Sequence, residues 1–336
     1  MTKTIEMNMH RERAKKLPVV TDEIWMNVNE DYRTLVEEFV SVQNHSNQTK
    51  KQYISSLKQF GFYLFDAMNN KPLHKVTKRD FLRYISYLRD NRKMSSSGIG
   101  MKKAAVSSLC NYIENVVSGD DEDESYKNFR SFTRGLPAIP KNVVYEKIKI
   151  TYAEYQEMMS VLENDENYLG MAWLSTAFNV GARRSEIVQF KSEIVDYEMS
   201  DDATFVYSHN IRLKGSGIDG KIEPYMINLE AIKYMKLWME KRGYEHEYIF
   251  TTKYNGEITP TSPAWADYFC THVLSDILGR RVNPHLFKAS CITYLLEQGI
   301  KLELVSKYVA HHENVATTIA HYDLRNFEEE KNGIFK

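Results

Sequence analysis

The chain has 336 residues, more than one typical domain, and its 43% hydrophobic content can supply ordinary buried cores, so we expect two domains. It contains no run of about 18 apolar residues, and its charged beginning lacks the apolar segment of a signal peptide. These features argue against a membrane protein and predict a cytoplasmic one. The net charge of −1 gives no sign of a nucleic-acid partner when it is taken alone.

The charges are unevenly distributed along the chain. Residues 49–103 contain thirteen lysines and arginines against three aspartates, a net charge of +10. Acidic residues gather instead at 120–124 and after residue 322. This segregation predicts a basic first region that can contact an anionic partner.

The sequence gives no sign of a metal centre. It has three scattered cysteines, Cys110, Cys270 and Cys291. They lack Cys-x-x-Cys spacing, so we expect reduced, buried thiols. The histidines at 311, 312 and 321 lack the His-Glu-x-x-His spacing of a zinc site. We therefore expect neither a metal nor a cofactor.

Helical periodicity begins near residue 30. Residues 1–30 are polar and are expected to form a flexible lead-in or a binding arm. Apolar positions then repeat at helical spacing, and Thr77 has the position of an N-cap, with Asp80 completing the cap. Four helices are predicted over residues 31–118.

Residues 119–150 are expected to be a linker, because an acidic run is followed by Pro137 and Pro140, which disfavour helix. Thr151 and Glu154 form a predicted capping box that starts the second domain. Helices are expected there at 152–163, 168–179, 229–242 and 264–279, the third of them ended by Gly243. Short strands are expected at 205–207 and 210–213, with 225–227 as their partner.

Three separate segments of the second domain carry a recognisable pattern. One reads Gly181-Ala-Arg183-Arg-Ser-Glu, another is a Lys214-Gly pair before a basic turn, and the last runs from His285-Leu-Phe-Lys288 through His312 to Tyr322. In order and spacing these segments resemble the tyrosine recombinase, or phage integrase, family. The resemblance covers about residues 45–325 and is weaker in the first domain.

The resemblance implies a mainly α fold of two domains that form a clamp around DNA. A helical, SAM-like core-binding domain would occupy 31–118, an α+β catalytic domain with a small antiparallel sheet would occupy 151–322, and a tail at 323–336 would be exchanged between protomers. The implied function is site-specific recombination, in which DNA is cut and rejoined through a 3′-phosphotyrosine intermediate by an integrase or transposase of a mobile element or phage.

The same resemblance assigns a role to each site residue. Tyr322 would be the nucleophile, because a phosphotyrosine linkage keeps the energy of the broken phosphodiester. Lys214, with Lys221 as the fallback, would protonate the departing 5′-oxygen. Cations and further hydrogen bonds for the phosphate would come from Arg183, His285, Lys288 and His312.

The implied partners are double-stranded DNA core sites, a homotetramer on two duplexes, and accessory DNA-bending or directionality factors. Phosphates would be contacted by basic residues of the first domain, because they supply the charge that displaces counterions. These residues are Lys50, Lys51, Lys78, Arg79, Lys93, Lys102 and Lys103.

The chain departs from the family pattern at two positions. Ala310-His311 stands before His312 where the family has Leu-Gly, and Lys288 stands where the family has arginine. If the site is otherwise shaped for arginine, Lys288→Arg should accelerate cleavage, and this is the outcome that we favour. If the site has adapted to lysine, the wider guanidinium should crowd it and the rate should fall. Two alternatives stay open: a noncatalytic DNA-binding protein with an eroded site, and an enzyme of the type IB topoisomerase kind. Arg183 could instead have a purely structural role in an ion pair with Glu186. We expect Arg184, and not Arg183, to be the structural partner of Glu186.

Overall fold

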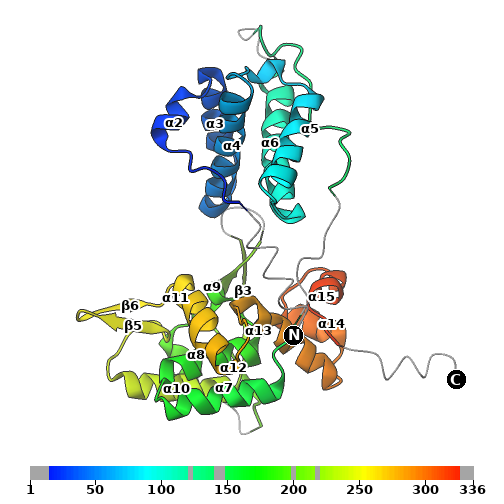
Figure 1. Ribbon diagram of the computed structural model, residues 1–336. Coiled ribbons are helices and arrows are strands. Elements are labelled where there is room, and N and C mark those ends of the chain that lie inside the picture. Colours follow the sequence, from blue (N-terminus) through cyan, green and yellow to red (C-terminus); the bar gives the residue numbers. More distant parts are fainter. Residues whose placement is uncertain (1–14, 120–123, 140–147, 198–201, 216–219, 326–336) are drawn as a thin grey trace, which may run out of the picture. The chain divides into compact units, whose positions relative to one another are not determined.

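The computed structural model describes residues 15–119, 124–139, 148–197, 202–215 and 220–325 (Figure 1). The chain divides into two compact units, Met1–Glu146 and Lys147–Lys336. Both are mainly helical, and the second also contains small antiparallel sheets, as the sequence predicts. Within the described residues, no helix is both long enough and apolar enough to cross a membrane.

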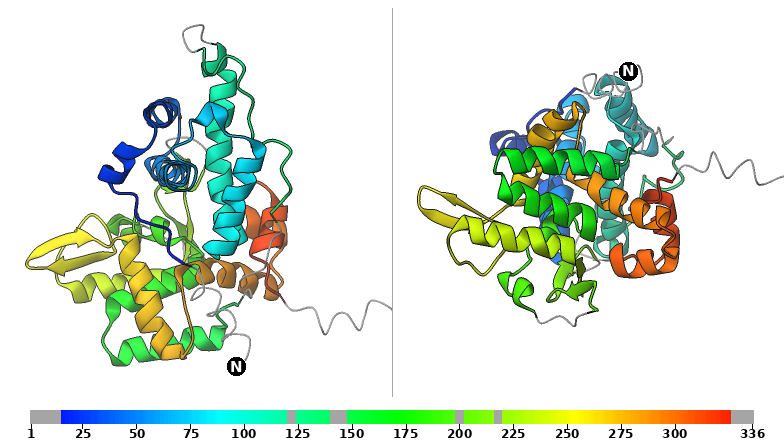
Figure 2. Two further views of the ribbon diagram at one scale, coloured as in Figure 1. Left: turned by 45° about the horizontal axis from the view of Figure 1, so that its top comes forward. Right: turned by 90° about the horizontal axis from the view of Figure 1, so that it is seen from below.

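The first unit is a bundle of helices around one apolar core. Its α-helices are α2 (Asp22–Asn27), α3 (Glu30–Val42), α4 (Asn47–Ala67), α5 (Lys78–Ser86) and α6 (Ser96–Asn115). Short turns of other helix types are η1 (Leu73–Lys75), η2 (Tyr87–Asn91) and η3 (Val117–Gly119). Figures 1 and 2 show α3, α4 and α6 packed side by side, so their apolar faces meet in the core.

This core extends beyond the predicted domain on both sides. Residues 15–30 are not all irregular: α2 forms there, and Trp25 is buried beneath the amine of Lys58, which lies 5.4 Å from its ring centre. From the predicted linker, Phe129 and Phe132 are buried in the same cluster. The aromatic side chains outweigh the local polarity that suggested a flexible lead-in and a linker. Residues 1–14 of the predicted arm lie outside the described residues.

The predicted helix boundaries that depend on capping are confirmed. Thr77 accepts a hydrogen bond from the backbone of Asp80, whose carboxylate accepts one in return from the backbone of Thr77. Thr151 and Glu154 form the same reciprocal pair. Gly243 ends its helix with a left-handed φ of +68°.

The second unit is built around the buried helix α8. Its other helices pack against α8 or against the helices that contact α8. The bounds are α7 (Tyr152–Asn164), α8 (Tyr168–Val180), α9 (Arg184–Ile187), η4 (Ser192–Asp196), α10 (Leu229–Arg242), α11 (Pro263–Tyr268), η5 (Phe269–Leu274), α12 (Ser275–Leu278), α13 (Pro284–Glu297), α14 (Leu302–Leu304), η6 (Val305–Val309) and α15 (Val315–His321). The fully buried Trp173 of α8 makes edge contacts with Phe269 and Phe287, which ties α13 to this core.

Three two-stranded antiparallel sheets complete the second unit. They pair β1 (Phe205–Tyr207) with β4 (Met226–Asn228), β2 (Ile211–Leu213) with β3 (Lys221–Glu223), and β5 (Thr251–Tyr254) with β6 (Glu257–Pro260). The strand expected at 225–227 therefore serves β1 alone, and β2 pairs with the nearer β3. The β5–β6 hairpin has no counterpart in the prediction. All three cysteines are buried and free, as expected.

Candidate active site

Arg183 lies directly before the short helix α9 and is its N-cap residue. Helix α8 ends at Gly181, whose φ of +67° is left-handed and favours glycine. A Cβ at Gly181 would lie 3.1 Å from Sγ of Cys291 on α13, so a side chain there would crowd the neighbouring helix. The turn after Gly181 thereby places Arg183 beside α13.

Glu186 holds Arg183 in place. The Arg183 backbone N–H donates to Oε2 of Glu186 at 2.7 Å, and its Nη1 donates to Oε1 at 2.9 Å. The hydroxyl of the buried Tyr225 donates to the same Oε2 at 2.6 Å. The expected pairing of Glu186 with Arg184 is wrong, because Arg184 pairs with Asp267 on α11. Glu186 thus fixes one edge of the Arg183 guanidinium, while 19% of the Arg183 side chain stays exposed.

Burial and charge act in opposite directions on this pair. Burial by itself lowers the pKa of Arg183, but the Glu186 carboxylate more than offsets this and the pKa is raised. Burial raises the pKa of Glu186, but the positive charges of Lys288 and Arg183 bring it below its ordinary value. Both groups are therefore charged near neutral pH, and the guanidinium is a permanent cation.

Lys288 lies beneath the surface of the site. It is only 2% exposed, and among the described residues its Nζ has no hydrogen-bond partner. The amine lies 6.0 Å from the centre of the Tyr225 ring. Burial, together with the charge of Arg183, lowers the pKa of Lys288 to about 7. An unpaired buried ammonium is costly, so the neutral amine is well populated at neutral pH.

His311 fills the position where the sequence pattern of the family has glycine. Its φ is +55°, so the left-handed backbone of a glycine is kept although a side chain is present. The ring is 4% exposed, and Nδ1 donates to Oε2 of Glu223 on β3 at 2.7 Å. It also makes an edge contact with the Tyr225 ring, with 4.4 Å between centroids. His311 therefore connects strand β3 to Tyr225, which is hydrogen-bonded to Glu186, the partner of Arg183.

The hydrogen bonds of His312 determine which ring nitrogen carries its proton. Oγ1 of Thr318 donates to Ser306 at 2.8 Å and lies 2.9 Å from Nδ1 of His312. A hydroxyl has one hydrogen, so Nδ1 is the donor to Thr318 and Nε2 is left as an acceptor. Burial, together with the charge of Lys288, lowers the pKa of His312 to about 4. Its neutral ring lies 4.8 Å, centre to centre, from the ring of Tyr322.

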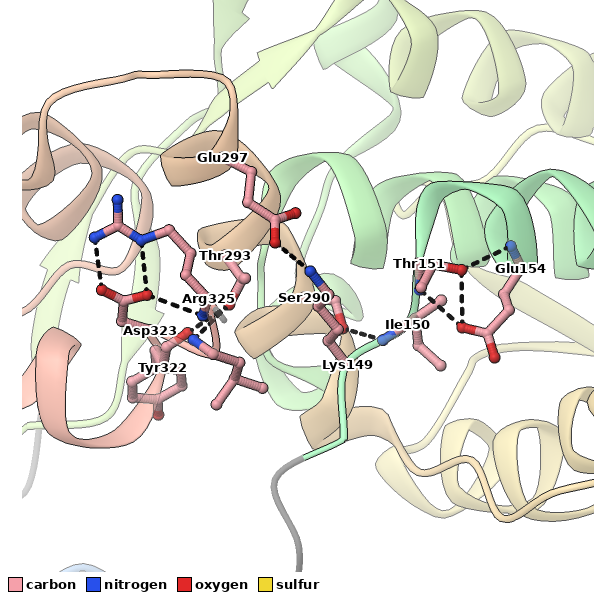
Figure 3. Close-up of polar contacts among 11 residues, drawn as sticks. Lys149, Ile150, Thr151, Glu154, Ser290, Thr293, Glu297, Tyr322, Asp323 and Arg325 are labelled. Atoms are coloured by element: carbon pink, nitrogen blue, oxygen red, sulfur yellow. Dashed lines mark hydrogen bonds and ion pairs between the residues drawn. The ribbon is translucent and has the colours of Figure 1, made fainter. Parts of the chain in front are cut away.

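The backbone around Tyr322 is held by neutral hydrogen bonds (Figure 3). Its N–H donates to the carbonyl of Thr318 at 2.9 Å, and its carbonyl accepts from Oγ1 of Thr293 on α13 at 2.8 Å. The same Oγ1 accepts from the N–H of Leu324 at 3.0 Å. Tyr322 is near enough to Arg183 to raise the pKa of that guanidinium when ionised. These contacts hold the backbone of Tyr322 against α13.

The same side of α13 also holds the beginning of the second unit (Figure 3). Oγ of Ser290 accepts from the N–H of Ile150 at 2.7 Å, and Glu297 pairs with Lys149. One helix therefore fixes the incoming chain, Lys288 and the backbone of Tyr322 together.

Lys214 and His285 lie at the edge of the same region. Lys214 directly follows β2 and is exposed. Burial, followed by the positive charges of Arg184, Arg183 and Lys214, lowers the pKa of His285. The cap of α13 is the side chain of Asn283, which accepts from the N–H of His285 at 3.1 Å. His285 thus begins the helix without capping it.

Comparison with known proteins identifies the family of the chain. Residues 149–329, more than half of its length, match the phage integrase family. The chain is also 61% identical over 336 residues to the SPbeta prophage-derived recombinase-like protein YomM of Bacillus subtilis (strain 168), with both chains covered completely. It belongs to the phage integrase family.

More distant members of this tyrosine recombinase group share most of the chain. Tyrosine recombinase XerC of Pediococcus pentosaceus is 23% identical over 294 residues, covering 85% of this chain and 90% of that protein. The structure of XerH bound to a palindromic difH substrate has a TM-score of 0.65 at 16% identity and covers 98% of this chain and 93% of that one. The Tn1549 transposon integrase in complex with transposon right end DNA has a TM-score of 0.64 at 14% identity, with coverages of 90% and 98%. These structures show a common fold.

The seven basic residues expected to contact DNA in this integrase-family chain are not equally exposed. Four are exposed, namely Lys51, Lys78, Arg79 and Lys93. Lys50 and Lys103 are half-buried, and Lys102 is buried at 7% exposure. Lys102 falls on the same stripe of α6 as the core residues Ile99 and Val106, so its stem is covered by the bundle. The structure thus removes Lys102 from the surface on which DNA contacts are expected.

Several residues that shape this integrase-family site were not singled out for a role from sequence. Tyr225 was predicted only as part of a strand, and no role was predicted for Thr293 or Glu223. Their function depends on partners that are distant along the chain: Tyr225 meets Glu186, Thr293 meets Tyr322, and Glu223 meets His311. A pattern of residue types gives no signal for such pairs.

Proposed function

We propose that this member of the phage integrase family is a site-specific DNA recombinase that acts through a 3′-phosphotyrosine intermediate. The placement of Tyr322 against a neutral His312, near the fixed guanidinium of Arg183, carries this proposal. A nucleophile, a proton acceptor and a phosphate-binding cation are the parts that phosphoryl transfer to a tyrosine requires.

The proposed cleavage step uses these groups in turn. Oη of Tyr322 attacks the scissile phosphorus while its proton passes to Nε2 of His312, whose low pKa rises when phosphate anions replace water beside it. Arg183 donates to the nonbridging oxygens. The bond from phosphorus to the 5′-oxygen breaks, and Lys214 gives that oxygen its proton. Religation reverses the step, because a phenol with a pKa near 10 is a competent leaving group.

The proposed substrate is a pair of duplexes carrying core sites, bound by four protomers. The two units would enclose DNA as a clamp, with the exposed basic residues of the first unit on the phosphates. Because the relative YomM is described as prophage-derived, we place the activity in the integration or excision of a phage or other mobile element, in the cytoplasm, with accessory DNA-bending or directionality factors. Residues 326–336 of the tail proposed for protomer exchange lie outside the described residues.

A noncatalytic DNA-binding protein is the second candidate, and the buried Lys288 is the observation that favours it. An amine that is 2% exposed does not reach a phosphate in this arrangement. An enzyme of the type IB topoisomerase kind is the third candidate. It would cleave DNA by the same phosphotyrosine chemistry but would rejoin strands within one duplex.

One experiment separates the three functions. The full chain is incubated with nicked duplexes carrying the attachment sites of its element, and covalent adducts are separated by denaturing gel. We expect an adduct with the natural chain, none with Tyr322→Phe, and equal DNA binding by both, since that change removes one oxygen. DNA binding without any adduct supports the noncatalytic protein, and adducts without joined products from two duplexes support the topoisomerase.

A further inference from the structure

The contact between His311 and Glu223 joins two segments that are 88 residues apart in the chain. Oε2 of Glu223 accepts from Nδ1 of His311 at 2.7 Å, while Oε1 pairs with Nζ of Lys221 at 2.8 Å on the same strand. Both carboxylate oxygens are thus engaged, one within β3 and the other across to the loop before His312. The carboxylate therefore fastens β3 to that loop.

Strand β3 is half of the hairpin that carries Lys214. In its register with β2, Ile211 lies opposite Glu223 and Leu213 lies opposite Lys221, and Lys214 is the next residue. A contact that holds Glu223 in place therefore anchors the end of the hairpin away from the turn, opposite Ile211, from which β2 runs directly to Lys214. The rest of the turn, residues 216–219, lies outside the described residues.

On its other side, His311 rests on the group that fixes Arg183. Its ring meets the Tyr225 ring edge-on at 4.4 Å, and Tyr225 donates to Glu186, the partner of Arg183. The φ of His311 is +55°, a left-handed conformation that glycine adopts most readily and that histidine adopts more often than most other side chains. The buried His311 ring therefore lies between Glu223 and Tyr225 without an unusual backbone.

We propose that His311 is a positioning residue, which through Glu223 holds the Lys214 hairpin in register with the Arg183–Glu186 pair. The proposal rests on the function proposed above, in which Lys214 protonates the departing 5′-oxygen. The side chain touches neither the phosphate nor the nucleophile. It keeps the proton donor at the distance from the scissile bond that transfer requires, because proton transfer depends steeply on alignment.

Two substitutions at one position separate the side chain from the backbone. His311→Gly relieves the left-handed conformation and removes the donor, whereas His311→Asn also accepts that conformation and keeps an N–H donor close to the place of Nδ1. Glu223→Leu removes the acceptor. If the two residues act as one link, the double variant with His311→Gly and Glu223→Leu should form adducts at the rate of the slower single variant.

The readout is the single-turnover rate of adduct formation on nicked duplexes with two leaving groups. One substrate has the ordinary bridging 5′-oxygen, and the other has sulfur at that position. A thiol has a pKa near 8.5 and leaves without a proton, so a misplaced Lys214 matters only for the oxygen substrate. Melting temperature and DNA affinity of each variant are measured in parallel.

On the oxygen substrate we expect His311→Gly to react about tenfold slower than the natural chain and His311→Asn within about threefold of it. On the sulfur substrate we expect His311→Gly to match the natural chain within about threefold. Equal rates of His311→Gly and the natural chain on oxygen would overturn the inference and leave the proposed function standing. An equal loss on both substrates would also overturn it. A natural chain without adducts on either substrate overturns the proposed function and this inference together.

Discussion

Two basic side chains of the site, Arg183 and Lys288, have opposite surroundings. Arg183 shares a carboxylate with its own backbone and with Tyr225, and its pKa is raised. Lys288 is more deeply buried, has no hydrogen-bond partner among the described residues, and has a pKa of about 7. One side of the site therefore holds a permanent charge, and the other holds an amine whose charge depends on pH and on what binds.

This difference changes the meaning of the lysine in an arginine position. A lysine placed in a site shaped for arginine would leave space and unused acceptors around it. Instead the side chain is enclosed, and His311 covers the neighbouring Tyr225. The lysine is thus enclosed even though its Nζ has no hydrogen-bond partner among the described residues, and four predictions, from the largest effect to the smallest, test the contrast with Arg183.

On the Arg183 side, Glu186→Ala should be the most damaging change. It leaves the guanidinium of Arg183 and the hydroxyl of Tyr225 without their acceptor, and loss of one partner of a buried pair costs about 3–5 kcal/mol. Urea denaturation of the full chain measures the free energy of unfolding. Glu186→Gln keeps one acceptor oxygen and should lose less, so equal losses in the two variants would count against this account.

The Tyr322 segment should respond to a single neutral hydroxyl. Thr293→Val keeps the shape of the side chain but leaves the Tyr322 carbonyl and the Leu324 N–H unpaired, which should destabilise the chain by about 1–3 kcal/mol and slow adduct formation. Thr293→Ser keeps the hydroxyl and should restore the rate. If Thr293→Ser is as slow as Thr293→Val, the hydroxyl does not position Tyr322.

On the Lys288 side, stability should depend on pH. The folded pKa of about 7 lies below the ordinary value of lysine, so the unfolded chain binds more protons between these pKa values and the free energy of unfolding rises as pH increases. The slope is at most about 1.4 kcal/mol per pH unit. Lys288→Met should flatten the profile between about pH 7 and 9 relative to the exposed-site control Lys253→Met. An unchanged slope in Lys288→Met would show that the amine is not buried.

The smallest effect concerns Lys288→Arg. The sequence alone favours faster cleavage, but in an enclosed site the wider guanidinium overpacks, at a cost of about 1–3 kcal/mol, and we now expect cleavage slowed by no more than about tenfold. Single-turnover cleavage decides it, and acceleration by Lys288→Arg alone would show that the site is shaped for arginine.

The sequence by itself determined what depends on neighbouring residues. The capping boxes at Thr77 and Thr151 and the helix end at Gly243 are confirmed because each interaction spans only a few residues. The order of residues along the chain is sufficient for these caps, since the groups that interact are already close in sequence. The family pattern named segments that are far apart in the sequence, and it did so by resemblance.

Only the tertiary structure decided the rest. Trp25 and Phe129 joined a core that local polarity did not predict, and β2 chose β3 over the more distant strand. Burial of Lys288 and the link from His311 to Glu223 arise where helices and strands far apart in sequence enclose the same space. Burial sets the pKa of a charged group, and a buried donor takes the acceptor that packing supplies, so both depend on neighbours that the linear sequence does not identify.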